Sequence, residues 1–64
     1  MGLGCSIARL RKIRGWTQAE LAEKAGLSAG YIAAIEEGRS RPSLKALAVI
    51  VKALGTSLDE LLRK

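Results

Sequence analysis

The sequence predicts an all-α protein, a compact bundle of five short helices. Apolar residues recur at helical spacing over most of its 64 residues. A glycine follows each of the first four apolar stripes, at Gly15, Gly26, Gly38 and Gly55. The composition is 48% hydrophobic, with one Trp, one Tyr and no Phe, so the core must be aliphatic, which suits closely packed short helices.

We expect residues 1–64 to form a single domain, because a chain of this length has one small core and buries only about 60% of its unfolded surface. On the first helix, Leu3, Ile7 and Leu10 share a face. Trp16 follows as a plug for the core, with stacking on a base as the alternative role. The expected helices cover roughly Leu3–Arg14, Gln18–Ala25, Ala29–Glu37, Leu44–Leu54 and Leu58–Arg63.

The second and third helices have the clearest start and stop signals. Thr17-x-x-Glu20 is a capping box that leads directly into an apolar stripe. Gly26 ends this helix, because a residue without Cβ enters the left-handed conformation at no steric cost. Ser28 caps the next helix, whose inward positions are Ile32 and Ile35. Two short helices joined by a tight glycine turn form a helix-turn-helix unit, here over residues 17–38.

The last two helices begin at serine caps. Ser43 follows Pro42 and precedes the fourth helix, and Ser57-x-x-Glu60 is a second capping box. Helical spacing predicts that the core stripe of the fourth helix consists of Leu44, Leu47, Ile50, Val51 and Leu54.

The chain resembles the Xre family, the helix-turn-helix DNA-binding domains of the phage Cro and lambda-repressor type. Gln18, Ala22 and Gly26 match the first helix and turn of that unit. The matching segments further along are I-E-x-G at residues 35–38, R-P-S at 41–43 and A-L-G-x-S-L-D-E-L-L at 53–62. The resemblance extends upstream to residues 7–11 and covers nearly the whole chain.

This resemblance implies a lambda-repressor-like fold and a transcriptional regulator acting on double-stranded DNA in the cytoplasm, at the nucleoid. The helix over residues 29–37 would enter the major groove while the preceding helix crosses the DNA backbone. It also implies an ion pair between Arg11 and Glu36 that ties the first helix to the third. The net charge of +5 suits a polyanionic partner.

Within that frame, two groups of residues would meet DNA. Candidates for the phosphate backbone lie at the starts of the second and third helices and in the loop after the third: Thr17, Gln18, Ser28, Tyr31, Arg39, Arg41 and Lys45. Thr17 is mainly a cap, and Tyr31 offers a hydroxyl to the backbone or covers the edge of the core. The base-facing positions are Ala29, Gly30, Ala33 and Ala34.

The base-facing residues depart from the family, because relatives usually carry side chains there that pair with base edges. Three explanations remain open. In the first, the alanine methyl groups pack on thymine methyls while Gly30 allows the helix to approach the bases closely. Alternatively, the protein binds mostly phosphates and discriminates poorly. Finally, the surface belongs to a natural or engineered scaffold or a protein-interaction module. Glu37 adds repulsion toward phosphates unless it accepts from a cytosine amino group.

Small residues on the fourth helix suggest where two copies would meet. Ala46, Val49 and Ala53 fall opposite the expected core stripe, so a homodimer through this face is a hypothesis. Such a dimer would place two recognition helices about 34 Å apart, one turn of DNA.

Other classes of function have little support. The sequence has one cysteine, Cys5, and no histidine, so we expect no disulfide, metal site or other cofactor. Asp59 and Glu60 are adjacent on a helix and point to different faces, no base accompanies the serines, and a small bundle offers no deep pocket. We therefore expect no enzymatic activity and no small-molecule ligand. No apolar run is long enough to span a membrane, and the N-terminus has no signal pattern.

Overall fold

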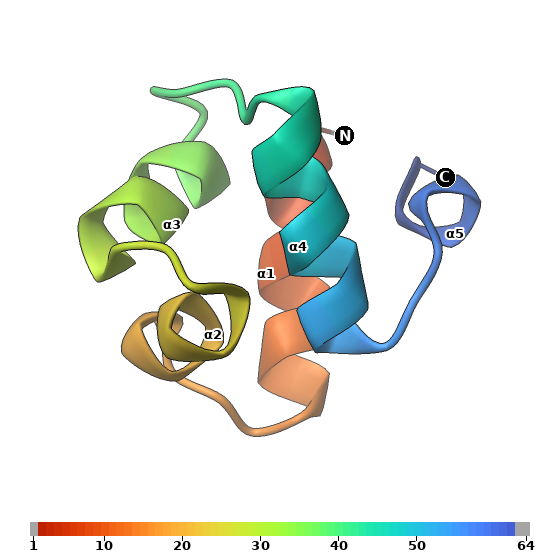
Figure 1. The fold of residues 1–64 in the computed structure, drawn as a ribbon, viewed down its shortest axis with the longest axis horizontal. Helices are drawn as coiled ribbons and strands as arrows, with labels where there is room; N and C mark the ends of the chain where they lie inside the picture. The colour runs from red at the N-terminus through yellow and green to blue at the C-terminus, as the bar shows by residue number, and fades with distance from the viewer. Residues whose placement is uncertain (1, 63–64) are drawn as a thin grey trace.

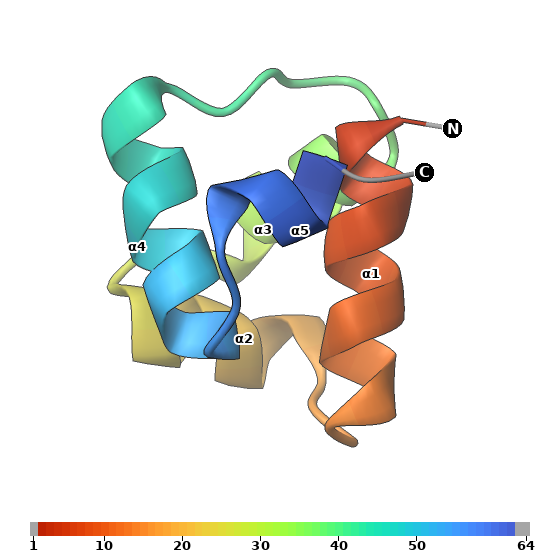
Figure 2. The same cartoon turned by 90° about the vertical axis from the view of Figure 1, so that its right-hand side faces the viewer.

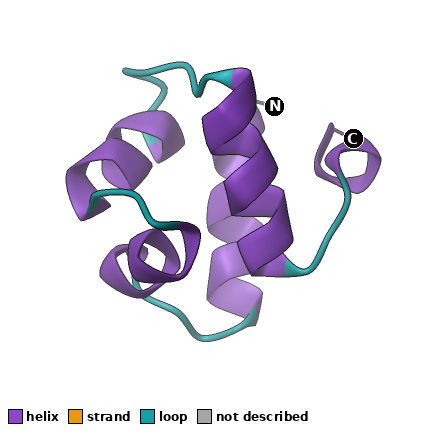
Figure 3. Ribbon diagram, in the orientation of Figure 1, coloured by secondary structure: helices purple, strands orange, loops and turns teal. Residues whose placement is uncertain are grey.

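A computed structural model of the protein describes residues 2–62. Over these residues it contains five helices and no strand (Figure 3). The all-α fold class is confirmed. The helices are α1 (Leu3–Ile13), α2 (Gln18–Ala25), α3 (Ala29–Glu36), α4 (Leu44–Leu54) and α5 (Leu58–Leu62). Helices α1 and α3 end one residue earlier than expected, and Arg63 lies outside the described residues.

The helices surround the core rather than forming layers. In Figure 1, α1 lies behind α4, but the view in Figure 2 separates them, with α5 nearer the viewer between the two. Helix α2 packs against α3 and α4, while α1 packs against α3 and α5. Helix α3 thus lies on the side of the molecule away from α5 (Figure 1).

All five helices contribute to one small aliphatic core. The core residues expected on α2 and α3 are buried, and each remaining helix adds one or two branched side chains. The buried cluster consists of Ile7, Leu21, Ala22, Ala25, Ile32, Ile35, Ile50, Leu54 and Leu61. Trp16 is half-buried against this cluster, and the Lys24 ammonium lies 4.8 Å from its ring centroid. A cation near the face of an aromatic ring is attracted by the ring's quadrupole, so Lys24 favours this position of the ring. The partial burial of the ring agrees with the predicted plug.

Gly4 lies where α1 crosses the end of α3. A Cβ at this position would lie 2.9 Å from the Glu36 Cα and still closer to the Ile35 carbonyl oxygen. Both atoms belong to the backbone, which cannot move aside as a flexible side chain can. The two helices therefore approach as closely as they do because residue 4 has no side chain.

Helix α4 buries only part of the predicted core stripe. Ile50 and Leu54 are buried as predicted, and Leu47 and Val51 pack partly against the core. Leu44 was expected in the core stripe, but it is 80% exposed. Ala46 is buried at 5% exposure, and Val49 and Ala53 are partly buried against the core. Lys45 and Lys52 are the polar residues of this helix, so its apolar surface is wider than the strip that the core can cover. Of the predicted dimer face, Ala46 is buried, and Val49 and Ala53 are partly covered by the core, so this face offers little surface to a second copy.

Candidate nucleic-acid interface

The α2–turn–α3 unit is built from the caps that the sequence predicts. The Thr17 N–H donates to Glu20 Oε1 at 2.7 Å, and the Glu20 N–H donates to Thr17 Oγ1 at 3.1 Å. Gly26 has a φ of +73°, and the next N–H, from Leu27, donates to the Ala22 carbonyl at 2.8 Å. Ser28 Oγ then accepts the Tyr31 N–H at 3.1 Å. The hydroxyls of Thr17 and Ser28 are thus used as caps, and the turn fixes the angle between the helices.

The outer surface of α3 consists of small apolar groups. Ala29 and Gly30 are exposed, and Ala33 and Ala34 are half-buried. A Cβ added at Gly30 would meet nothing within 4 Å, so no packing inside the molecule requires a glycine there. This surface offers methyl groups and backbone to a partner and no side-chain hydrogen bond.

Tyr31 connects α3 to the start of α4. Its hydroxyl oxygen accepts the Ser43 N–H at 3.3 Å, and its half-buried ring packs against the core. The phenol therefore covers the edge of the core, which was one of its two predicted roles. Its own O–H proton is not used in this bond and remains able to donate to a phosphate.

Gln18 has a partner inside the molecule that the sequence did not reveal. Its Nε2 donates to Glu36 Oε1 at 2.9 Å, so the side chain extends toward α3. Because an amide nitrogen carries two protons, one remains for an external acceptor. The expected phosphate contact of Gln18 would use a side chain already oriented by Glu36.

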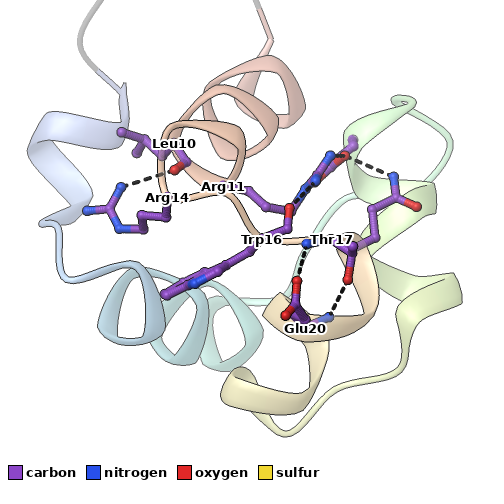
Figure 4. A network of polar contacts seen from close by, with 8 residues as sticks. Leu10, Arg11, Arg14, Trp16, Thr17 and Glu20 are labelled. Carbon is purple, nitrogen blue, oxygen red and sulfur yellow. Dashed lines mark hydrogen bonds and ion pairs between the residues drawn. The ribbon is translucent and has the colours of Figure 1, made fainter.

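Arg11 belongs to the network of polar contacts drawn in Figure 4, and its main partner is Glu36. Arg11 Nε lies 2.7 Å from Glu36 Oε2, and a second guanidinium nitrogen donates to Oε1 at 3.0 Å. The third nitrogen donates to the Trp16 carbonyl at 2.7 Å. The two side chains are only 9% and 6% exposed. The pair implied by the family resemblance is therefore present, bidentate and nearly buried, and it joins α1, the α1–α2 loop and α3.

The ionisation of this pair follows from its contacts. Its hydrogen bond to Glu36 raises the pKa of Arg11. Burial acts to raise the pKa of Glu36, but the hydrogen bonds from Arg11 and Gln18 outweigh it, so that pKa is lowered. Both groups are thus charged at neutral pH, and they hold the recognition unit against α1.

The predicted cations differ in their surroundings. Arg39 Nε lies 2.8 Å from Glu37 Oε1, directly after α3. Arg41 and Lys45 are exposed, and within residues 2–62 their side chains have no hydrogen-bond or ion-pair partner. The cationic loop, which we define as residues 39–43, and the adjoining first turn of α4 therefore present two available cations, Arg41 and Lys45, and one that is already paired, Arg39.

A second surface feature lies between α4 and α5. A shallow groove there is almost entirely apolar, and Leu44 and Leu58, 80% and 40% exposed, form its rim. Its lining residues are Leu44, Leu47, Ala48, Val51 and Leu58, which we call the α4–α5 groove. The apolar residues on the outer side of α4 were visible in the sequence, but Leu44, Leu47 and Val51 were predicted to belong to the core.

The remaining features concern metal binding, membrane spans and the cysteine. Among the described residues there is no group of three His, Cys, Asp or Glu side chains that could hold a metal ion. None of the described helices is long and apolar enough to cross a bilayer. Cys5 is exposed on α1.

Residues 7–61 match the family model described as helix-turn-helix. The chain belongs to the helix-turn-helix family of the phage-repressor type. It is 46% identical over 59 residues to the immunity repressor protein of Bacillus phage phi105. The aligned segment covers 92% of this chain and 41% of that protein. This domain therefore spans less than half of the phage repressor. It is 39% identical to a second relative, a transcriptional regulator from Sinorhizobium fredii, and spans 77% of that protein.

Solved structures of regulators have the same fold as this helix-turn-helix domain. The controller protein C.AhdI from Aeromonas hydrophila superposes with a TM-score of 0.91 at 30% identity, covering 94% of this chain and 91% of that one. The DNA-binding domain of the P22 c2 repressor gives a TM-score of 0.91 at 32% identity, covering 97% and 82%. The predicted family and the predicted class, a domain of transcriptional regulators, are confirmed.

Proposed function

We propose that this domain binds double-stranded DNA by inserting α3 into the major groove, as part of a transcriptional regulator working at the nucleoid. The observation that carries the proposal is the α2–turn–α3 unit, whose outer surface is free while Arg41 and Lys45 stand unpaired beside it. Helix α2 would cross the backbone, with Gln18 donating to one phosphate and Tyr31 to another. The cationic loop would contact the phosphates that follow.

We propose that base recognition is apolar. Ala29, Ala33 and Ala34 would pack their methyl groups on thymine methyls, which are accessible in the major groove. Gly30 supports this reading, because glycine inside a helix costs about 0.5–1 kcal/mol relative to alanine and packing does not require it here. Without a Cβ at that position, the first turn of α3 can lie closer to the base edges.

The deciding experiment is selection from a randomised duplex library at about 150 mM salt, a concentration at which phosphate contacts alone bind weakly. We expect an enriched sequence with thymines at fixed positions. Recovery without any enriched sequence, alongside measurable binding, would leave only phosphate-driven binding. No recovery, even at low salt, would refute the proposed function and favour a protein-interaction module or a scaffold.

Replacing Ala33 with glutamate should abolish binding to the selected duplex, because it places a carboxylate against base edges and phosphates. Electrophoretic mobility shift or fluorescence anisotropy would measure the loss. Cys5→Glu is the matched control, since it adds the same charge at an exposed position on α1. If Ala33→Glu binds as well as Cys5→Glu, α3 is not the element that enters the groove.

We further propose that two copies bind together through the α4–α5 groove, which replaces the face predicted from the sequence. Leu44 is the first residue of α4, directly after the cationic loop, so a two-fold axis near this residue would bring the two loops close together. A symmetric pair would also cover a leucine that is otherwise 80% exposed.

Leu44→Glu should prevent this association, because pairing would bury two carboxylates in an apolar contact. Sedimentation equilibrium should then show a monomer where the unaltered protein shows a dimer, with unfolding nearly unchanged because the residue is exposed. Lys52→Glu, an exposed change near the other end of α4, is the control. A dimer that survives Leu44→Glu would place the contact elsewhere.

A further inference from the structure

Glu37 and Arg39 form an ion pair at the end of α3 that faces the cationic loop. Arg39 Nε donates to Glu37 Oε1 at 2.8 Å, and the two side chains are 62% and 57% exposed. Glu37 is the C-terminal cap residue of α3, and it directly follows Glu36. The recognition helix therefore ends on a carboxylate beside a surface whose other charged groups are cations.

This pair has little to contribute to folding. Pairs between exposed side chains stabilise proteins only slightly, because water screens them and both side chains lose freedom. A carboxylate at a helix C-terminus is also repelled by the partial negative charge of the helix dipole. Glu37 thus costs the helix something locally, and Arg39 compensates for that cost.

The backbone of this loop is held by hydrogen bonds, while the two side chains are exposed to solvent. The N–H groups of Arg39 and Ser40 both donate to the Ala34 carbonyl, at 2.8 and 3.1 Å. Arg39 can therefore exchange one acceptor for another by rotating its side chain, without moving the loop. A phosphate can replace the Glu37 carboxylate as the acceptor, since both are oxyanions that accept charge-assisted hydrogen bonds from the guanidinium.

We propose that Glu37 determines the specificity of this domain for its DNA site by competing with phosphates for Arg39. The proposal rests on the proposed function and concerns its selectivity. Binding to arbitrary sequences depends almost entirely on phosphate contacts, so a carboxylate that occupies Arg39 weakens that binding directly. At the correct site, the contacts of α3 add to the phosphate contacts and Arg39 transfers from Glu37 to a phosphate. The base-facing surface of α3 would thereby discriminate between DNA sequences more sharply than its own contacts allow.

Glu37→Gln tests this proposal. With a random-sequence duplex at about 50 mM salt, we expect the affinity to rise roughly three- to tenfold and the slope of log K against log salt to steepen by about 0.9, one additional phosphate contact. The ratio of affinities for the selected and the random duplex should fall. Glu60→Gln removes the same charge on α5, away from α3, and should change neither quantity (Figure 1).

The same substitution in an Arg39→Ala background separates exchange from simple repulsion. If Glu37 acts by holding Arg39, Glu37→Gln should raise the affinity much less in that background. An equal gain in both backgrounds, or no gain in the first, overturns the proposal. A protein that binds no duplex even at low salt refutes the proposed function instead, so the two failures are distinguishable.

Discussion

Replacing Arg11 with methionine should lower the free energy of unfolding by about 3–5 kcal/mol, because it leaves the Glu36 carboxylate nearly buried without its cation. Only the Gln18 amide would still donate to it. A domain of 64 residues has a total stability of roughly 3–10 kcal/mol, so much of the variant should be unfolded at 37 °C. Urea denaturation followed by circular dichroism measures the change.

The double variant Arg11→Met, Glu36→Leu distinguishes a stranded charge from lost packing. Replacing both partners with apolar side chains removes the buried charge, so most of the stability should return. The prediction is contradicted if Arg11→Met alone unfolds with the midpoint of the unaltered protein. Equal instability of the single and double variants would show that the geometry of the pair, and not a stranded charge, stabilises the fold.

The pH dependence of stability gives a third measure of this pair. Since the pKa of Glu36 is lowered in the folded protein, its contribution is complete above the unfolded pKa, about 4.3. The contribution is then lost as the pH falls through the lower folded value. The difference in unfolding free energy between the protein and Glu36→Gln should therefore be constant from about pH 6 to 8 and shrink in acid, as protonation neutralises the native carboxylate too.

Gly4→Ala should destabilise the protein by about 3 kcal/mol, a large effect for one added methyl group. The new Cβ would collide with the backbone of Ile35 and Glu36, so α1 or the end of α3 would have to shift. This shift would also disturb the contact between Arg11 and Glu36, which joins the same two helices. Thermal unfolding should show a fall of more than 10 °C, since each 1 kcal/mol corresponds to about 4–8 °C at this size.

Gly30→Ala is the matched control. It is also a helical glycine, but its added Cβ meets nothing within 4 Å. This change should raise stability by about 0.5–1 kcal/mol through the better helix propensity of alanine. If Gly4→Ala shifts the midpoint upward as Gly30→Ala does, α1 does not require its close approach to α3.

Local signals in the sequence were sufficient for the secondary structure and for the helix-turn-helix unit. The capping box at Thr17 and Glu20, the turn at Gly26 and the caps at Ser28 and Ser43 all form as predicted. Each involves contacts between residues only a few positions apart, so the residue types at those positions are sufficient to predict them. The same holds for the ends of the helices, which fall within one residue of expectation wherever the structure describes them.

Contacts between distant segments decided the rest of the candidate interface. Gln18 was expected to extend toward a phosphate, but Glu36, eighteen residues away, accepts its amide proton. The pairing of Arg39 with Glu37, by contrast, joins residues two positions apart, and it was not predicted.

The sequence by itself determined the helices, their caps, the family and the inward residues of α2 and α3, because those follow from periodicity and short-range hydrogen bonds. Only the tertiary structure decided which side of α4 is buried and why residue 4 is a glycine. The apolar surface of α4 is wider than the strip that the core can cover, so its neighbours in space select the part that is buried. In the same way, a close approach between α1 and α3 exists only after both helices have packed.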